Sequence, residues 1–197
     1  LFDSPDAEFR STGIVHAVGT QLDSIRFLPN AASGTESWGG IRIYGYPCSE
    51  LDCIDLRDNI ARFEYVRVSH VVNTWGGFMF LSDRLGPGLS MRNCIISRNH
   101  GLEELAGMYI GPNSPSYSVS QCVFAYNSTP GTGGGVGFGS VTGQFDSCIV
   151  AFNNAGQGGG ISWGGVIGMR DCTLYGNTPE NINLISSRSM RNIIVAG

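Results

Sequence analysis

Short segments in which apolar and polar side chains alternate recur along the chain and predict β-strands. Four segments share one pattern: a polar residue, a cysteine, a mainly apolar strand, and an asparagine five residues after the cysteine. They cover residues 93–99, 121–127, 147–153 and 171–177, and their cysteines are 28, 26 and 24 residues apart. A short strand that repeats at such a period is typical of a solenoid, in which each coil stacks on the next.

The cysteine-bearing strand has further copies, and two other strands accompany it. The further copies are residues 24–27, 65–68 and 192–195. A second strand follows at residues 40–43, 77–80, 107–110, 135–138, 160–163 and 181–184, and a weaker third strand precedes the cysteine at residues 118–120, 141–143 and 166–168. The sequence therefore predicts an all-β fold, a right-handed single-stranded parallel β-helix of about seven coils with three strands per coil.

Two-residue alternation predicts which side chains of the cysteine-bearing strand point inward. They are Ile25, Phe27, Val66, Val68, Cys94, Ile96, Cys122, Phe124, Cys148, Val150, Cys172, Leu174, Ile193 and Val195. Equivalent side chains in stacked coils lie above one another and point the same way, which is a poor geometry for disulfides. The cysteines in this set are therefore predicted to form a column of buried thiols.

Asparagines are predicted to form a ladder at the turn after this strand, in which each side-chain amide bonds those above and below. The members are Asn99, Asn127, Asn153 and Asn177. Asn127-Ser128-Thr129 also matches the glycosylation acceptor pattern, which is the alternative role for that asparagine.

We predict one domain over residues 1–197, with a loop inserted around residues 44–60 because the first coil is too long. This loop contains Cys48 and Cys53, a candidate local disulfide if the protein is extracellular.

Composition supports strands and turns and argues against two classes of partner. The chain has 29 glycines and only 14% charged residues. The net charge of −4 argues against a nucleic-acid partner. No apolar run approaches the ~18 residues of a membrane span. All 12 basic residues are arginine.

The predicted outer faces contain no pair of carboxylates of the kind that glycoside hydrolysis requires. The outward residues of the cysteine-bearing strand are Arg26, Arg67, Ile95, Val123, Ile149, Thr173 and Ile194, and those of the second strand are Arg42, Met79, Tyr109, Gly137, Ser162 and Asn183. Asp146 and Asp171 lie near strand starts but are offset by one position, and Glu103-Glu104 is predicted to be a solvated loop tip. An active site made from loops remains the alternative.

Two other patterns are candidates for a metal site and a phosphate-binding loop. His70 and His100 follow successive strands and could approach each other, but no third metal ligand shares their spacing. The glycine-rich run at residues 131–139 lacks the Gly-Lys-Ser/Thr ending of a phosphate-binding loop. The sequence therefore predicts no catalytic residue, metal or cofactor.

The outward row does contain a candidate interaction stripe, because stacked β-branched side chains would form a continuous apolar surface. Its members are Ile95, Val123, Ile149 and Ile194. The last strand ends in Ile193-Ile194-Val195-Ala196-Gly197 without a polar cap. We expect another protein chain, or a missing continuation of this one, to cover that end.

Trp38-Gly39-Gly40-Ile41 and Phe63-Glu64-Tyr65-Val66 resemble bacterial right-handed parallel β-helix surface proteins. The later coils resemble polymorphic outer-membrane-protein repeats, with Gly158-Gly159-Gly160-Ile161 close to their GGA-[ILV] motif and Phe124-Ala125-Tyr126-Asn127 matching FxxN. Val150 and Leu174 replace the phenylalanine in other coils. The resemblance implies a secreted or surface-displayed protein with an adhesive or structural role.

The sequence thus favours an extracellular or cell-surface structural or adhesive protein, acting as a scaffold or assembly subunit, with carbohydrate as another candidate partner. The alternative is a polysaccharide-active enzyme, a lyase or glycoside hydrolase, on the same scaffold.

Overall fold

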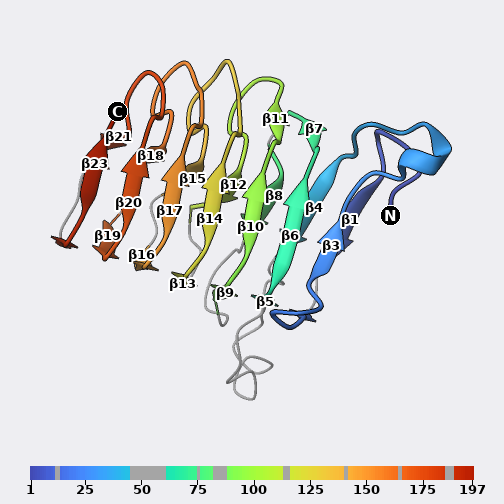
Figure 1. Cartoon of the computed structure of the whole chain (residues 1–197), viewed down its shortest axis with the longest axis horizontal. Helices are drawn as coiled ribbons and strands as arrows, with labels where there is room; N and C mark the ends of the chain where they lie inside the picture. Colours follow the sequence, from blue (N-terminus) through green and yellow to red (C-terminus); the bar gives the residue numbers. More distant parts are fainter. Residues whose placement is uncertain are drawn as a thin grey trace.

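Parallel strands stacked in three sheets make up almost all of the molecule (Figure 1). The computed structural model describes residues 1–11, 14–44, 61–74, 76–81, 88–112, 116–139, 142–163, 166–184 and 189–197. Sheet I contains β1 (Glu8–Ser11), β4 (Gly40–Tyr44), β8 (Phe78–Leu81), β12 (Met108–Ile110), β15 (Val136–Phe138), β18 (Ile161–Trp163) and β21 (Ile182–Leu184). Sheet II contains β2 (Val15–Val18), β5 (Ala61–Glu64), β9 (Leu89–Arg92), β13 (Tyr117–Ser120), β16 (Thr142–Asp146), β19 (Val166–Arg170) and β22 (Ser189–Arg191). Sheet III contains β3 (Ile25–Phe27), β6 (Val66–Ser69), β10 (Ile95–Ser97), β14 (Val123–Ala125), β17 (Ile149–Ala151), β20 (Thr173–Tyr175) and β23 (Ile194–Ala196).

The chain visits the three sheets in turn, so the fold is a parallel β-solenoid, as the sequence predicts. Sheet III is the predicted cysteine-bearing strand, sheet I the second strand and sheet II the third. The solenoid makes about 5 turns, slightly fewer than the seven coils predicted. Among the described residues, the first and last strands of each sheet pair on one side only and form the two ends of the stack.

Little other regular structure is present in the described residues. A two-stranded pair, β7 (Val72–Asn73) and β11 (His100–Gly101), extends one corner, and η1 (Ala31–Ser33) is a single 3-10 turn. No helix in this part of the chain has the length and apolar character needed to cross a membrane. The predicted disulfide, Cys48 with Cys53, lies outside the described residues.

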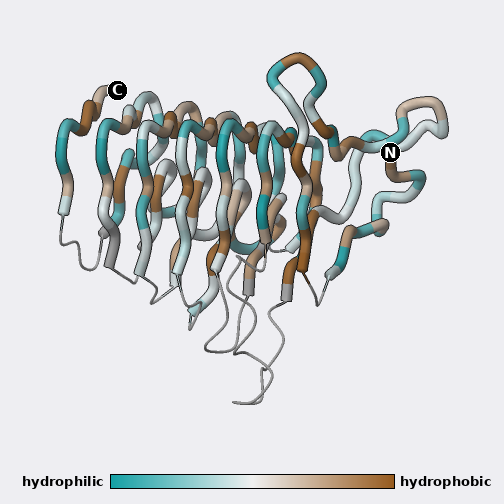
Figure 2. The backbone as a smooth tube through the Cα atoms, turned by 90° about the horizontal axis from the view of Figure 1, so that it is seen from below, coloured by the Kyte–Doolittle hydropathy of each residue, from teal (hydrophilic) through white to brown (hydrophobic). Residues whose placement is uncertain are grey.

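Side chains that point inward fill the solenoid with a continuous apolar core. Hydrophobic stretches recur at corresponding positions from coil to coil (Figure 2). The predicted inward residues of the five interior strands of sheet III are buried, whereas Val195 on the terminal strand is 54% exposed. At the other end, the rings of Phe2 and Trp38 stack at 4.1 Å, and Phe27 stacks on Trp38 at 6.2 Å. The amino-terminal end of the core is therefore covered by aromatic rings, and the carboxy-terminal end is open.

Both corners that flank sheet III are built from residues in the left-handed backbone region. Before sheet III these residues are Tyr65, Asn93, Gln121, Ser147, Asp171 and Asn192, and after it they are His70, Arg98, Tyr126, Phe152 and Gly176. Residues other than glycine seldom adopt this conformation. Here the stacking of equivalent corners in successive coils holds them in it. Each corner thus adds a column of side chains along one edge of sheet III.

The asparagines after the second corner form a hydrogen-bonded ladder through the interior. Asn127 Nδ2 donates to Asn153 Oδ1 at 2.9 Å, and Asn153 Nδ2 donates to Asn177 Oδ1 at 2.9 Å. Asn99 Nδ2 donates to Asn127 Oδ1 at the same distance. The ladder extends one step beyond the prediction, because Asn177 Nδ2 donates to Asn181 Oδ1 at 2.7 Å. Asn127 is fully buried in this ladder, a position that leaves no room for a glycan.

The four cysteines of sheet III's corner stack as free, buried thiols, each 1% exposed. Their packing is not purely apolar, because the Sγ–H group donates to the carbonyl two residues earlier. These contacts join Cys94 to Arg92, Cys122 to Ser120, Cys148 to Asp146 and Cys172 to Arg170 at 3.1–3.2 Å. The thiol therefore also satisfies a carbonyl at the left-handed corner.

We expect thiol reagents to spare this column in the folded protein and to label all four cysteines after denaturation. Burial keeps the reagent from sulfur, so labelling has to await unfolding. The measurement uses a Cys48→Ser/Cys53→Ser variant, so that only the column reacts. Asn154→Cys, which adds an exposed thiol next to the ladder, should label at once. Rapid labelling of the column without denaturant would contradict the inward assignment.

Two predicted outward residues are buried instead: Arg42 on β4, and Gly137 on β15, which is covered by the Leu105 side chain. Arg42 on β4 is 2% exposed, because β1, which the sequence analysis did not identify, pairs alongside it. Its guanidinium donates to the carbonyls of Gly39 and Gly76 at 3.1 and 3.0 Å and lies 3.6 Å from the Glu8 carboxylate. The outer face of sheet I is thus closed at its amino-terminal end.

Candidate binding face on sheet III

The outer face of sheet III presents one side chain per strand along the solenoid. Strand register aligns Arg26, Arg67, Ile95, Val123, Ile149, Thr173 and Ile194 in a single row. The members of the predicted interaction stripe therefore lie in one row. Thr173 stands between Ile149 and Ile194 in this row. Ile95 and Val123 are half-buried, whereas Ile149 and Ile194 are 45% and 62% exposed.

An aromatic column, defined as Tyr126, Phe152 and Tyr175, runs beside the carboxy-terminal half of this row. The rings of Tyr126 and Phe152 stack at 5.2 Å, and Tyr175 meets Phe152 edge to face at 5.1 Å. All three rings are about half exposed. Two of them occupy the left-handed corner that precedes the asparagine ladder, which directs them outward. The sequence analysis missed this column, although Tyr126 and Phe152 each directly precede a ladder asparagine.

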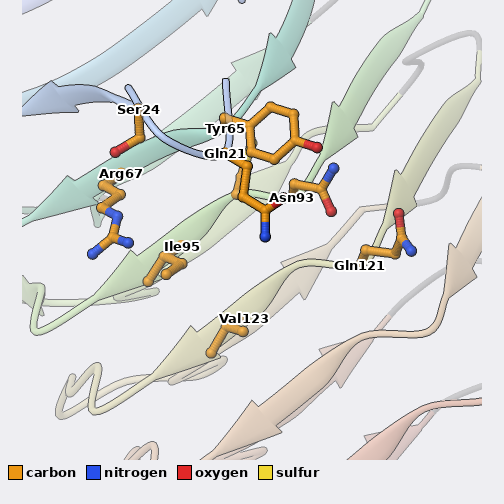
Figure 3. A pocket seen from close by; sticks show the side chains of 9 residues that line it. Gln21, Ser24, Tyr65, Arg67, Asn93, Ile95, Gln121 and Val123 are labelled. Carbon is orange, nitrogen blue, oxygen red and sulfur yellow. The ribbon is translucent and has the colours of Figure 1, made fainter. Parts of the chain in front are cut away.

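The opposite edge and the amino-terminal half of the face are polar. A hollow of about 340 Å³ lies between the row and the first corner column (Figure 3). Arg67, Ile95 and Val123 project from neighbouring strands along one side, and Tyr65, Asn93 and Gln121 from successive corners along the other, with Gln21 and Ser24 at the amino-terminal end. A second hollow of about 200 Å³ adjoins it and shares Arg67 and Ile95. Arg26 and Arg98 line this second hollow.

No described residue that lines either hollow carries a carboxylate. A hollow on the outer face of sheet II contains Glu64, whose carboxylate accepts from Arg62 at 2.8 Å. The face of sheet III can therefore hold a ligand through cationic, amide and apolar groups, but it offers no acid pair.

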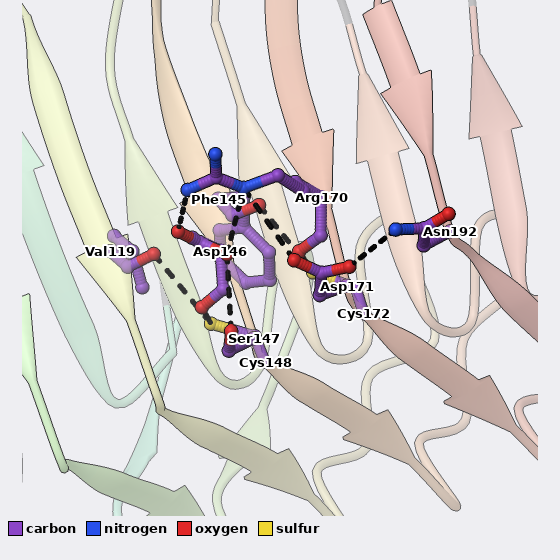
Figure 4. A network of polar contacts seen from close by, with 9 residues as sticks. All are labelled: Val119, Phe145, Asp146, Ser147, Cys148, Arg170, Asp171, Cys172 and Asn192. Atoms are coloured by element: carbon purple, nitrogen blue, oxygen red, sulfur yellow. Dashed lines mark hydrogen bonds and ion pairs between the residues drawn. The ribbon is translucent and has the colours of Figure 1, made fainter.

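The two aspartates near successive strand starts are held by one arginine (Figure 4). The Arg170 guanidinium pairs with the Asp146 carboxylate and lies 3.6 Å from that of Asp171, which also accepts from Asn192 at 2.8 Å. Hydrogen bonding to Arg170 lowers the pKa of Asp146 below its usual range. A general acid at neutral pH needs a raised pKa, so this network fits surface stabilisation better than acid catalysis.

The structure gives no support to His70 and His100 as a pair of metal ligands. Strand register places His100 opposite Val72, two positions beyond His70, and each imidazole bonds a different serine. His70 Nδ1 lies 2.9 Å from Ser69 Oγ, and His100 Nδ1 lies 2.9 Å from Ser128 Oγ. Among the described residues, no three His, Cys, Asp or Glu side chains gather as metal ligands.

Comparisons of the chain with protein-family models, with curated proteins and with solved structures found no match. The arrangement of residues on the solenoid is therefore the basis for any functional conclusion.

Proposed function

We propose that the protein is a structural or adhesive β-helix of the extracellular space or bacterial cell surface, which acts as a scaffold or assembly subunit. Its likeness to polymorphic outer-membrane-protein repeats belongs to the same proposal. The single observation that supports it best is the exposed apolar surface on sheet III. Ile149, Ile194 and the aromatic column are all at least 44% exposed there.

This surface suits another protein chain more than a small molecule. It is flat and extended, since its residues come from successive strands about 4.8 Å apart. Isolated exposed apolar residues need no partner, but a contiguous patch of stacked aliphatic and aromatic side chains is a mark of an interaction site. Aromatic residues are also enriched at the centres of protein interfaces.

The occupant we propose is a second copy of this chain. The patch continues into β23, whose Ile194 and Val195 are exposed at the open end of the core. β21, β22 and β23 each have a strand neighbour on one side only among the described residues. Packing of a second copy would cover the patch, and strand addition at the open end is the second way in which a chain could associate.

Replacing both Ile149 and Phe152 with aspartate is expected to abolish self-association and leave the fold intact. The two charges would be buried without partners in the interface but remain hydrated in the separate chain. Sedimentation velocity over a concentration series measures the association, and circular dichroism checks the fold. Thr142→Asp, on an exposed position of sheet II, is the matched control and should associate like the unaltered chain.

The stripe would be excluded as the contact surface if the double variant associated as strongly as the unaltered chain. Loss of association only in Val195→Lys would assign the contact to the open end instead. An unaltered chain that stays monomeric at every concentration would overturn assembly through a second copy.

The alternative, a polysaccharide-active enzyme, gains no support from the described residues. The one pair of aspartates on successive corners is engaged by Arg170 rather than directed at a shared hollow.

A further inference from the structure

Three arginines on the amino-terminal half of the sheet III face have no acidic partner among the described residues. Arg26 and Arg67 are adjacent in register on β3 and β6, and Arg98 follows β10 at the corner. All three are exposed. Their guanidinium groups form no ion pair or hydrogen bond with another described residue, whereas Arg10, Arg42, Arg62 and Arg170 all pair with acids.

Neighbouring polar side chains also have hydrogen-bonding groups without a partner among the described residues. The side chains of Gln21 and Asn93, which line the larger hollow, make no hydrogen bond with a described residue. Gln121 is held through its Oε1, which accepts from Arg92 Nε at 3.0 Å, so its amide nitrogen remains for a ligand. Side-chain amides both donate and accept, which matches the hydroxyl groups of a sugar.

Charge and shape select the class of ligand. A guanidinium presents a fork of N–H donors that matches a carboxylate, and no carboxylate of a described residue lines these hollows to compete for it. The two hollows share Arg67 and Ile95 and each spans several neighbouring strands, and together they reach across the face of sheet III from the corner before it to the corner after it. We propose that this groove, formed by Arg26, Arg67, Arg98, Asn93 and Gln121, binds a carboxylated polysaccharide, with arginines on the carboxylates and amides on the hydroxyls.

Nucleic acid is a poorer fit for the same groove. Nucleic-acid sites carry a basic excess over a whole face or domain, whereas this chain has a net charge of −4. The aromatic column that could stack bases lies beside the other half of the sheet. The groove borders the stripe at Ile95 and Val123. Its arginines and amides lie outside the surface of Ile149, Ile194 and the aromatic column on which the assembly proposal rests, so this inference does not depend on that proposal.

The test measures binding of alginate, a linear polymer with a carboxylate on every sugar, by affinity electrophoresis of the whole chain. We expect alginate to retard the protein and its neutral propylene glycol ester to have little effect. Arg67→Gln, the arginine shared by both hollows, should weaken binding about tenfold. The triple variant Arg26→Gln/Arg67→Gln/Arg98→Gln should abolish it.

Arg191→Gln is the matched control, because Arg191 is exposed, makes no ion pair with a described residue and belongs to sheet II. It should bind like the unaltered chain, and thermal melting should show that all variants fold. Equal binding of the ester, or equal loss in the control, would overturn the proposed carboxylate recognition. Tighter binding of double-stranded DNA than of alginate would replace the polysaccharide with a phosphate polymer. Absence of alginate binding by the unaltered chain would refute the site, and the sedimentation experiment would remain unaffected.

Discussion

Replacing Asn127 with alanine is expected to lower the free energy of unfolding by about 3–5 kcal/mol, because its side chain is fully buried within the hydrogen-bonded ladder. The substitution removes four hydrogen bonds. Asn127 Oδ1 accepts from both the backbone N–H and Nδ2 of Asn99, at 3.1 and 2.9 Å. Its Nδ2 donates to Ile96 O at 3.1 Å and to Asn153 Oδ1 at 2.9 Å. The groups left behind are buried, so water cannot replace the lost partner.

Urea denaturation measures this loss of free energy, and the melting temperature should fall by roughly 10 °C. Asn154→Ala changes the next residue, whose side chain is exposed, and should alter stability by less than about 0.5 kcal/mol. Asn127→Asp tests the donor bonds separately from the acceptor bonds. It keeps the oxygen that accepts from Asn99 but has no N–H to donate to Ile96 or Asn153. It should remain clearly destabilised. A loss below about 1 kcal/mol for Asn127→Ala would show that the ladder is not a main source of stability.

Replacing Gly107 with alanine is expected to destabilise the solenoid by about 2–4 kcal/mol. A Cβ at this position would lie 2.1 Å from the carbonyl oxygen of Gly135 in the next coil and 3.0 Å from Asn127 Nδ2. Both neighbours belong to the buried stack, so the added methyl group can be accommodated only by separating two coils. The glycine that precedes β12 is thus required by close approach between coils, and not by its own backbone conformation.

Gly34→Ala is the informative control, because at Gly34 the backbone conformation requires glycine and the available space does not, which is the opposite of Gly107. Gly34 has a φ of +78°, but a Cβ there would meet nothing within 4 Å. Its cost should be the left-handed backbone penalty of about 1–2 kcal/mol. Chemical denaturation of the two variants compares them directly. An equal or smaller loss for Gly107→Ala would mean that coil spacing adjusts to the methyl group at little cost.

The sequence repeat predicts most of the architecture. Two-residue alternation assigned the inward side chains of sheet III, and the constant interval from cysteine to asparagine placed both columns on the same side of successive coils. These features are local and periodic, and stacking in register converts sequence period into vertical alignment. The candidate stripe was predictable for the same reason.

Features that depend on packing between neighbouring coils could not be predicted from the sequence. Arg42 alternates like an outward residue, and only the packing of β1 buries it. Glycine occurs where sheet I strands begin for different reasons, because Gly40 has a φ of +97°, while Gly107 is set by the distance to the next coil. The two histidines seemed equivalent by position, but strand register offset them.

The sequence by itself determined the period, the inward faces and the identity of the stacked columns, because alternation and repetition are properties of the chain alone. Tertiary structure decided which outward residues share a surface. The left-handed corners turned Tyr126 and Phe152 outward beside the stripe, and the strand register aligned Arg26 with Arg67 while Arg98 came alongside from the far corner. These residues are separated by tens of positions along the chain, and only the spacing of stacked coils brings them within reach of one ligand.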